Sequence, residues 1–416
     1  MIVSDFVNRR TSFRFAGKEV LLDLSLGLFS SAGVDAGSML LLKSLGKELD
    51  LDGEEAPKRV LDVGCGAGTL GLAMASRLAG GRAVLVDRDE LAVAFSRHNA
   101  AVNSLKNVET TSRLMIEGPH EAPYGLIVSN FPAKAGDPVL ADFLKRSLGI
   151  LSPGGRAAVV IVHTLADRCR HLINAVGGEI VHEDATKMHS VFHYRNTGAS
   201  AGSPMRSGTE GNSGAKSEED DPLAPYIRHS GEFKIGRTRY RADTVWNVPD
   251  FDTLSWRLAL IGDTLDREPR SGTMVFSEPG QGHLPVAVAA RKGARPERIV
   301  LAGRDRLQLL ISRHNLERTV PGVPAEFLSL TEPSGLADAL GSDAADFLVT
   351  DLNPVPRTDW TGPLRAAAAA VVKSGGEWAV VGRSADVTAL LKSSRGWTPL
   401  QDGRNRGWRA TVLRRN

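Results

Sequence analysis

Three glycines stand at alternate positions in residues 60–68, Val-Leu-Asp-Val-Gly-Cys-Gly-Ala-Gly, and an amphipathic stretch follows them directly. Because they lack a Cβ atom, Gly64, Gly66 and Gly68 let the backbone turn tightly and approach a ligand closely beside the start of a helix. Asp87 ends the next apolar run about 20 residues later, where a carboxylate can accept hydrogen bonds from a ribose diol. The spacing D-x-G-x-G-x-G differs from the G-x-G-x-x-G of nicotinamide enzymes, and it predicts a site for another nucleoside-containing cofactor. The alternative is a glycine turn that only lets a helix pack on a sheet.

A second group of residues ends another apolar run, in the segment Leu-Ile-Val-Ser-Asn-Phe-Pro-Ala-Lys-Ala-Gly. Asn130, Phe131 and Pro132 follow a strand at the edge where ligands bind in open α/β sheets. A conjugated amine is a poor nucleophile, because its lone pair is delocalised. A side-chain amide oxygen and a backbone carbonyl can accept its hydrogens, orient the lone pair and stabilise the developing charge. Phe131 is the aromatic residue that this segment offers for stacking on a base, and an ordinary strand-to-loop turn is the alternative.

A third motif lies in residues 27–42, Gly-Leu-Phe-Ser-Ser-Ala-Gly-Val-Asp-Ala-Gly-Ser-Met-Leu-Leu-Leu. Together the three motifs resemble the MTS ("methyltransferase small") superfamily of class I S-adenosylmethionine (SAM) dependent methyltransferases, which includes duplicated ribosomal RNA guanine-N2 methyltransferases. The resemblance covers residues 10–195. Asp35 is also a good N-cap, so a capped core helix is the alternative for the third motif.

The resemblance implies SAM as the cofactor and an exocyclic amine of a base in ribosomal RNA, with guanine N2 favoured, as the acceptor. It implies direct in-line transfer, with no metal and no covalent enzyme intermediate. The residues that it assigns to cofactor binding are Phe29, Asp35, Gly37, Ser38, Asp62, Gly64, Cys65, Gly66, Gly68, Asp87, Arg88 and Asn130. Those that it assigns to catalysis are Asn130, Phe131 and Pro132. Lys134 either contacts an anionic group of the substrate or is a solvated loop residue.

The chain departs from the family pattern in two ways. In the ribosomal enzymes the degenerate copy comes first, whereas here the order is reversed. Their Asn-Pro-Pro-Phe-His becomes Asn-Phe-Pro-Ala-Lys in residues 130–134, so the stacking aromatic is missing from its usual place. The alternatives are therefore a methyltransferase of a protein amide or small-molecule amine, and a SAM- or RNA-binding pseudoenzyme.

The elements that must position these residues alternate between strands and helices in the first half of the chain. Apolar runs predict strands, and apolar residues at helical spacing predict helices between them. Such alternation indicates a parallel, doubly wound α/β sheet. The predicted strands are 59–63, 83–87, 107–112, 125–129 and 157–162, and the predicted helices are 35–49, 69–79, 89–103, 138–151 and 164–176.

The second half repeats the same series of elements. Residues 298–315 match residues 82–99 over their whole length, and both end in Ser-Arg-His-Asn. Order and spacing are kept across the other anchors, so the sequence predicts two tandem Rossmann-like domains from an internal duplication. We expect a catalytic domain at 1–195, a flexible linker at 196–222 and a degenerate domain at 223–416. The linker segment 196–221 lacks aromatic residues, Val, Ile and Leu, so it cannot bury enough apolar surface to offset its ordering entropy.

The second copy has lost the residues that the resemblance assigns to SAM. Phe276 and Glu278 replace Asp62 and Gly64, Gly303 replaces Asp87, and Asp351 replaces Asn130; Pro279 also stiffens the turn. Residues 223–416 carry 27 basic and 21 acidic side chains, a net of 27 − 21 = +6. We expect Arg237, Arg239 and Arg241, with Tyr240, and the C-terminal segment with Trp408 to contact RNA; solvated strand faces are the alternative.

Length and composition fit two globular domains rather than one. Cys65 and Cys169 fit no metal or redox spacing, and the N-terminal residues carry no long apolar run. We therefore expect a cytoplasmic, monomeric protein with RNA as its partner and with neither a metal nor a membrane.

Overall fold

The computed structural model describes residues 3–51, 53, 56–197, 221–266 and 268–416, which form two compact units. The N-terminal unit spans Phe6–Tyr226, and the C-terminal unit contains Ile227–Asn416. The predicted linker falls almost entirely on residues 198–220, which lie outside the described residues. Within the described ranges, no helix is long and apolar enough to cross a membrane.

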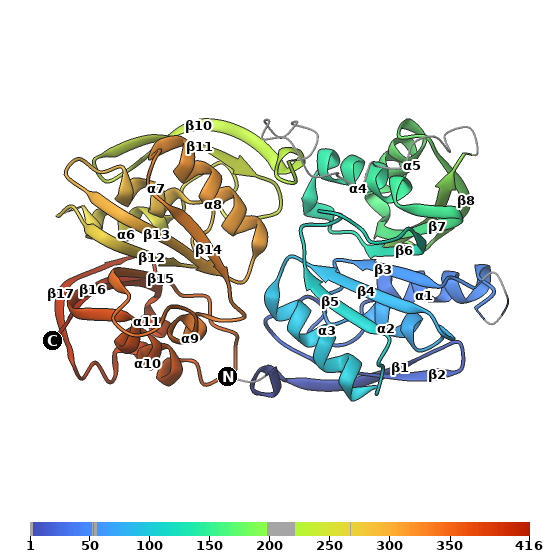
Figure 1. Ribbon diagram of the computed structural model, residues 1–416, viewed down its shortest axis with the longest axis horizontal. Helices are drawn as coiled ribbons and strands as arrows, with labels where there is room; N and C mark the ends of the chain where they lie inside the picture. Colours follow the sequence, from blue (N-terminus) through green and yellow to red (C-terminus); the bar gives the residue numbers. More distant parts are fainter. Residues whose placement is uncertain (1–2, 52, 54–55, 198–220, 267) are drawn as a thin grey trace. The chain divides into compact units, whose positions relative to one another are not determined.

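The N-terminal unit is built on a seven-stranded sheet with the strand order β5-β4-β3-β6-β7-β9-β8 (Figure 1). The first five strands in this order are parallel, whereas β9 runs antiparallel to both of its neighbours. The chain moves outward from β3 to β5 and then returns to β6 on the other side of β3. The carboxyl ends of β3 and β6 therefore flank the position where such sheets bind ligands. The strands are β3 (Arg59–Val63), β4 (Arg82–Asp87), β5 (Val108–Ser112), β6 (Tyr124–Asn130), β7 (Leu151–Val162), β8 (Gly178–Ala185) and β9 (His189–Asn196).

Helices cover both faces of this sheet, and an N-terminal hairpin covers the layer that carries α1, α2 and α3 (Figure 1). Helices α1 and α3 begin where an aspartate caps them: Asp35 accepts from the amide of Ser38, and Asp89 accepts from that of Leu91. The helices are α1 (Ala36–Glu48), α2 (Thr69–Ala75), α3 (Glu90–Val102), α4 (Asp137–Gly149) and α5 (Ala166–Ala175), and the hairpin is β1 (Arg9–Phe15) and β2 (Lys18–Leu24).

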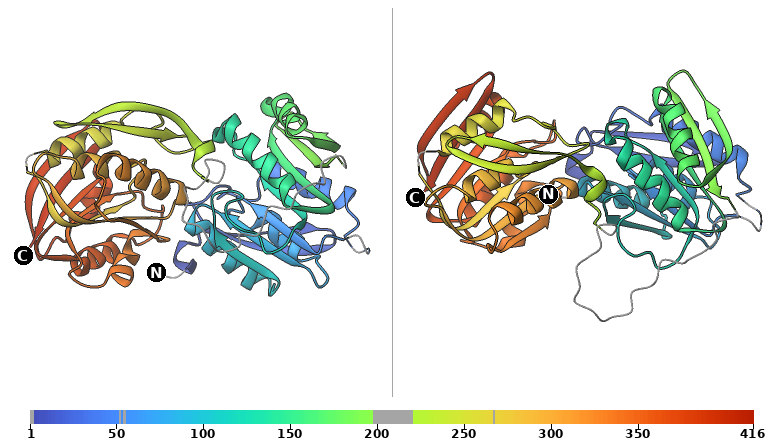
Figure 2. Two further views of the ribbon diagram at one scale, coloured as in Figure 1. Left: turned by 45° about the horizontal axis from the view of Figure 1, so that its top comes forward. Right: turned by 90° about the horizontal axis from the view of Figure 1, so that it is seen from above.

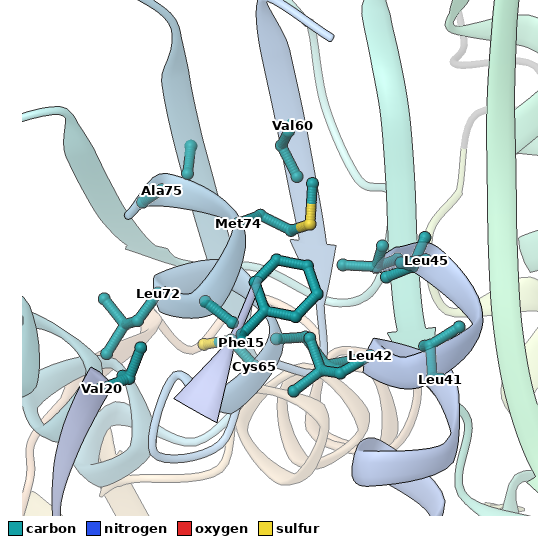
Figure 3. Packing of buried hydrophobic residues seen from close by; sticks show 14 of the residues in the cluster. Phe15, Val20, Leu41, Leu42, Leu45, Val60, Cys65, Leu72, Met74 and Ala75 are labelled. Atoms are coloured by element: carbon teal, nitrogen blue, oxygen red, sulfur yellow. The ribbon is translucent and has the colours of Figure 1, made fainter. Parts of the chain in front are cut away.

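The core of this unit lies between the hairpin, α1, α2 and the sheet. Figure 3 shows the ring of Phe15 among side chains of α1 and α2, including Leu42 and Met74, with Val60 of β3 nearby. All four are at most 4% exposed. Alternate residues of the hairpin therefore supply one wall of the core.

The C-terminal unit repeats this plan with the strand order β14-β13-β12-β15-β16-β18-β17. Its hairpin packs on α7 and α8 (Figure 2). Its strands are β10 (Ile227–Ile235), β11 (Thr238–Val245), β12 (Ser271–Ser277), β13 (Arg295–Gly303), β14 (Ala325–Ser329), β15 (Ala345–Asp351), β16 (Val372–Arg383), β17 (Trp397–Asn405) and β18 (Trp408–Arg415). Its helices are α6 (Trp256–Leu265), α7 (His283–Ala289), α8 (Arg306–Thr319), α9 (Leu336–Leu340), α10 (Thr361–Val371) and α11 (Ser384–Leu391). The matching strand orders confirm the predicted α/β class with two doubly wound sheets.

Two elements differ from the sequence-based expectations. Helix α2 ends at Ala75 rather than at residue 79, since the amides of Arg77 and Leu78 donate to carbonyls three residues back instead of four. Strand β8 was not predicted, since its polar residues show little apolar alternation and it pairs only at the edge of the sheet.

Candidate active site

The glycine-rich loop follows β3 and is fastened to the end of β4. The amides of Gly64 and Cys65 both donate to the carbonyl of Val86, at 2.8 and 3.0 Å. Gly64 and Gly66 have φ values of 74° and 55°, and a Cβ atom added to either would meet nothing within 4 Å. The loop thus presents bare backbone to open space, as close approach by a ligand requires.

Asp87 holds its carboxylate beside this loop. Its Oδ2 accepts from the amide of Gly66 at 2.9 Å, and its Oδ1 accepts from the amide of Asp89 at 3.0 Å. Arg88, the next residue, is half-buried. The loop and the carboxylate at the end of β4 are therefore adjacent, which is the arrangement expected for backbone and ribose contacts to one nucleoside.

Asp62 and Cys65 are buried beneath the loop. Asp62 is 1% exposed, and its Oδ2 accepts from the amide of Gly71 in α2 at 2.7 Å. Burial, together with the nearby charge of Asp87, raises the pKa of Asp62 to about 7. The Cys65 thiol is 3.2 Å from the hydroxyl of Ser96, and burial raises its pKa well above the usual range. In this conformation both side chains support the loop from below.

Asn130, at the end of β6, is oriented by the third motif. Its Nδ2 donates to Oδ2 of Asp35 at 2.8 Å and to the hydroxyl of Ser38 at 3.0 Å. An ionised carboxylate only accepts hydrogen bonds, so the amide nitrogen must face Asp35. The carbonyl Oδ1 of Asn130 is then left to accept hydrogen bonds from a substrate.

His189 joins this group, although none of the three sequence motifs contains it. A Cβ atom on Gly37 would lie 2.9 Å from Oδ2 of Asp35 and 3.0 Å from Cδ2 of His189, so the imidazole packs directly on the first turn of α1. His189 is brought there by the pairing of β9 with β7, opposite Val162. No local spacing in the sequence signals this position. By contrast, His193 is fully buried, with Nε2 2.9 Å from the hydroxyl of Ser44, and packs within the fold.

The remaining residues of the three motifs occupy different environments. The ring of Phe131 is 4% exposed and packs on Phe143 with the ring centroids 5.4 Å apart. The predicted stacking of Phe131 on a base is therefore wrong for this conformation, because the ring belongs to the core. Pro132 and Lys134 are exposed directly after the strand. Phe29, before α1, is 74% exposed and is the aromatic side chain that this part of the unit leaves free for a ligand.

The repeated Ser-Arg-His-Asn ties the glycine-rich loop to the hairpin in both units. In the N-terminal unit, Asn99 accepts from the amide of Asp23 and donates to the carbonyls of Asp23 and Ala67, while Ser96 donates to the carbonyl of Gly66. His98 lies 2.8 Å from the carboxylate of Asp23. In the C-terminal unit, the same bonds join Ser312, His314 and Asn315 to Gly280, Asp243 and Gln281. The motif thus holds the loop and the hairpin together by hydrogen bonds and is not a set of reacting groups.

The corresponding crevice of the C-terminal unit has different contents. Glu278 keeps a positive φ of 57° at the place of Gly64, and its Oε1 accepts from the amide of Arg304 at 3.3 Å. Gly303 leaves room for it where Asp87 stood, since a Cβ there would lie 3.5 Å from the same oxygen. Asp351, at the place of Asn130, lies 3.2 Å from Nε of Arg257. Burial raises the pKa values of Glu278 and Asp351 to about 7.

The basic hairpin of the C-terminal unit fits its predicted surface position only in part. Arg239 and Arg241 are exposed on β11, and Arg237, before it, is 87% exposed beside Asp266. Tyr240 is 5% exposed and lies 3.1 Å from Nδ1 of His283, so its predicted stacking on RNA is wrong. Trp408 already stacks with Arg383, at 4.1 Å from the guanidinium carbon to the ring centroid.

Comparison with known proteins places the N-terminal unit in a family. Residues 20–192 match the methyltransferase small domain (MTS) model. Over 156 residues the chain is 33% identical to the uncharacterized protein YbxB of Bacillus subtilis, a match that covers 37% of this chain and 75% of that protein. Over 161 residues it is 35% identical to ribosomal RNA small subunit methyltransferase C of Pseudomonas paraeruginosa, covering 36% of this chain and 44% of the relative.

A solved structure supports the two-unit architecture. The 16S rRNA N2 methyltransferase RsmC of T. thermophilus, in complex with AdoMet and guanosine, superposes with a TM-score of 0.62 at 18% identity, and the match covers 100% of both chains. At that identity the likeness concerns the fold. Together with the family match and the YbxB match, it shows that the chain belongs to the MTS family of class I, SAM-dependent methyltransferases.

Proposed function

We propose that the N-terminal unit transfers a methyl group from SAM to the N2 amine of a guanine in small-subunit ribosomal RNA, in the cytoplasm. The acceptor is suggested by the names of relatives such as that of Pseudomonas paraeruginosa, of which the chain spans less than half the length. The observation that carries the proposal is the orientation of Asn130, whose nitrogen is committed to Asp35 and Ser38.

The residues around the glycine-rich loop fit the cofactor. Gly64 and Gly66 offer open backbone, and Asp87 places a carboxylate where a ribose diol would bind. When bound, SAM supplies an electrophilic methyl group on its sulfonium. The half-buried Arg88 and the exposed Phe29 belong to the proposed cofactor site, and Asp62 and Cys65 support its loop.

Asn130 would act by holding the acceptor amine. Its Oδ1 accepts one amine hydrogen, which aims the nitrogen lone pair and stabilises positive charge as the new bond forms. Asp35 and Ser38 fix the amide so that little reorganisation is needed. Pro132 bounds the same strand end, and Lys134 is placed on the exposed side, where a phosphate of the RNA can reach it.

Labelling with tritiated SAM tests the proposal. We expect label in small ribosomal subunits isolated from cells that lack this protein, and we expect it to comigrate with N2-methylguanosine after nuclease digestion. Label in protein or in small molecules instead would support the alternative acceptors, and SAM binding without any transfer would support a pseudoenzyme. A chain with Asp35→Asn should keep SAM binding but transfer more slowly, because an amide at 35 no longer dictates which side of Asn130 faces the substrate.

A further inference from the structure

The crevice of the C-terminal unit is a lined pocket at the carboxyl ends of β12 and β15. Its walls come from the residues before and at the start of α6, from the β12–α7 loop and from the end of β15, and it has a volume of about 150 Å³. Pockets for drug-sized ligands are about 300 Å³ or larger. The volume lies below that range, so the crevice suits a single ring system better than a whole SAM molecule.

Besides Nε of Arg257, which lies near Asp351, three buried polar atoms at this crevice have no hydrogen-bond partner among the described residues. They are Oδ1 of Asp351, the hydroxyl of Ser277 and Nε2 of His283, from residues that are 9%, 2% and 1% exposed. Leaving a buried polar atom unpaired costs about 1–3 kcal/mol. A ligand that pairs with such atoms recovers part of that cost, so they favour a binding site over a crevice that side chains have filled.

The charges of the crevice select among ligands. Arg257 lies between two carboxylates, with Nη2 3.2 Å from Asp250 and Nε 3.2 Å from Asp351. Glu278 adds a third acidic group to the lining. Pro279 has no N–H to offer at the turn where phosphate-binding loops donate theirs. The pocket thus disfavours phosphates and favours a neutral ligand with N–H donors.

We propose that this crevice binds one unpaired guanine of RNA, with the N1–H and N2–H groups donating to Asp351 and with O6 accepting from Arg257. This inference rests on the proposed function in taking RNA as the macromolecular ligand. Adenine presents an unprotonated N1 at the same edge, so it cannot offer the two adjacent N–H donors that guanine gives to the two oxygens of Asp351. Leu258, Phe276 and Val349 line the pocket and can enclose the base.

The surroundings of the pocket fit a single strand whose base is inserted. Arg228 lies over the ring of Trp246 at 4.3 Å, and Arg406 lies over Trp256 at 3.8 Å. Trp256 directly precedes Arg257, so the second pair borders the pocket. Paired arginines and aromatic rings offer phosphate contacts and stacking surfaces outside an acidic base pocket.

The test is equilibrium dialysis of the full chain with labelled guanosine, inosine, adenosine and spermidine. The chain carries Asn130→Ala, so that the proposed substrate position of the N-terminal unit contributes little. We expect one guanosine per chain, inosine about tenfold weaker because it lacks the 2-amino group that donates to Asp351, and adenosine weaker still. Asp351→Asn should weaken guanosine about tenfold or more, whereas Asp338→Asn, an exposed acid on α9, should change nothing.

A second variant tests the pocket independently, in case Asp351→Asn does not fold. Asn353 is exposed and lines the pocket, so Asn353→Trp should block the mouth without disturbing the core and should weaken guanosine to a similar extent. Guanosine binding that neither variant changes would overturn the proposal, and so would adenosine or spermidine binding as tightly as guanosine. Methyl transfer by the Asn130-intact chain is scored separately. Absent transfer with Asp351-dependent guanosine binding would count against the proposed function alone.

Discussion

The two crevices of this chain hold a carboxylate at different points of the same framework. In the N-terminal unit it stands on the strand, as Asp87, and the loop is open glycine. In the C-terminal unit it stands on the loop, as Glu278, and the strand ends in Gly303. The exchange keeps the local volume filled, so the fold survives while the space for a ribose does not. The difference shows that fold and chemistry depend on separate residues.

The side chains at the ends of β6 and β15 also differ between the two units in their chemistry and in their partners. Asn130 is held by a capping aspartate and a serine at the start of α1. Asp351 faces Arg257, which is the second residue of α6 just as Gly37 is the second residue of α1. A neutral amide that can accept from an amine has thus been replaced by an ion pair.

The largest effect is expected from giving the N-terminal unit the acid of its partner copy, with Asn130→Asp. The new carboxylate would lie beside that of Asp35 and could not donate to it as Nδ2 of Asn130 does, so the side chain would no longer be fixed in the orientation that holds the amine. We expect methyl transfer to fall by about a hundredfold to a thousandfold, while calorimetry shows SAM still bound. The exposed Asn174→Asp, on α5, makes the same chemical change as a control. Near-normal transfer by Asn130→Asp would mean that another group holds the acceptor.

A smaller effect is expected from copying Glu278 into the glycine-rich loop, with Gly64→Glu. The side chain would enter the space beside Asp87, and we expect the Kd for SAM to rise about a hundredfold, or about 2.7 kcal/mol. Gly64→Ala carries the same backbone strain with a small side chain, and Gly149→Glu adds the same charge at an exposed helix end. Equal losses in Gly64→Ala and Gly64→Glu would assign the effect to strain instead of to the carboxylate.

These comparisons also show what could be read from the sequence. The two sheets followed from periodicity, because buried parallel strands are nearly continuous apolar runs. The three motifs identified Asp87 and Asn130 because their residue types and spacing are local. The direction in which a ring points depends on residues that are distant in the sequence. Phe131 and Tyr240 were therefore assigned to stacking, although the structure buries both.

Contacts made through the sheet were also beyond the sequence. His189 reaches α1 only because β9 inserts between β7 and β8. The Arg257–Asp351 pair joins residues almost 100 positions apart, and its equivalence to Gly37 and Asn130 becomes clear only when the helix starts are aligned. The sequence showed that the tetrapeptide is repeated, but its hydrogen bonds to the hairpin and the loop are visible only in the fold.

The hydrogen bonds of the repeated Ser-Arg-His-Asn motif should contribute equally to the stability of the two units. Asn99→Ala and Asn315→Ala each remove a side chain that bonds both the hairpin and the loop, and we expect each to destabilise its own unit by about 2 kcal/mol. Hydrogen exchange followed by mass spectrometry, resolved by peptide, measures each unit within the full chain. Arg97→Ala and Arg313→Ala, which change the exposed residue of the same motif, are the controls. A loss of stability confined to Asn99→Ala would mean that the motif serves ligand binding rather than folding.

The smallest effect concerns Asp62, whose counterpart is the apolar Phe276. The folded pKa of Asp62, about 7, lies above the value of 3.8 for an unburied aspartate. The stability from its protonated form is therefore fully present below pH 3.8 and is lost as the pH rises through 7. Asp62→Asn keeps an acceptor for Gly71 and cannot ionise. Relative to the unchanged chain, the N-terminal unit of this variant should become progressively more stable as the pH rises from 4 to 7, read from hydrogen exchange of α2. The C-terminal unit should keep its pH dependence, since Glu278 and Asp351 remain. If the N-terminal slope does not change, Asp62 is ionised throughout this range, and burial alone does not distinguish it from an ordinary carboxylate.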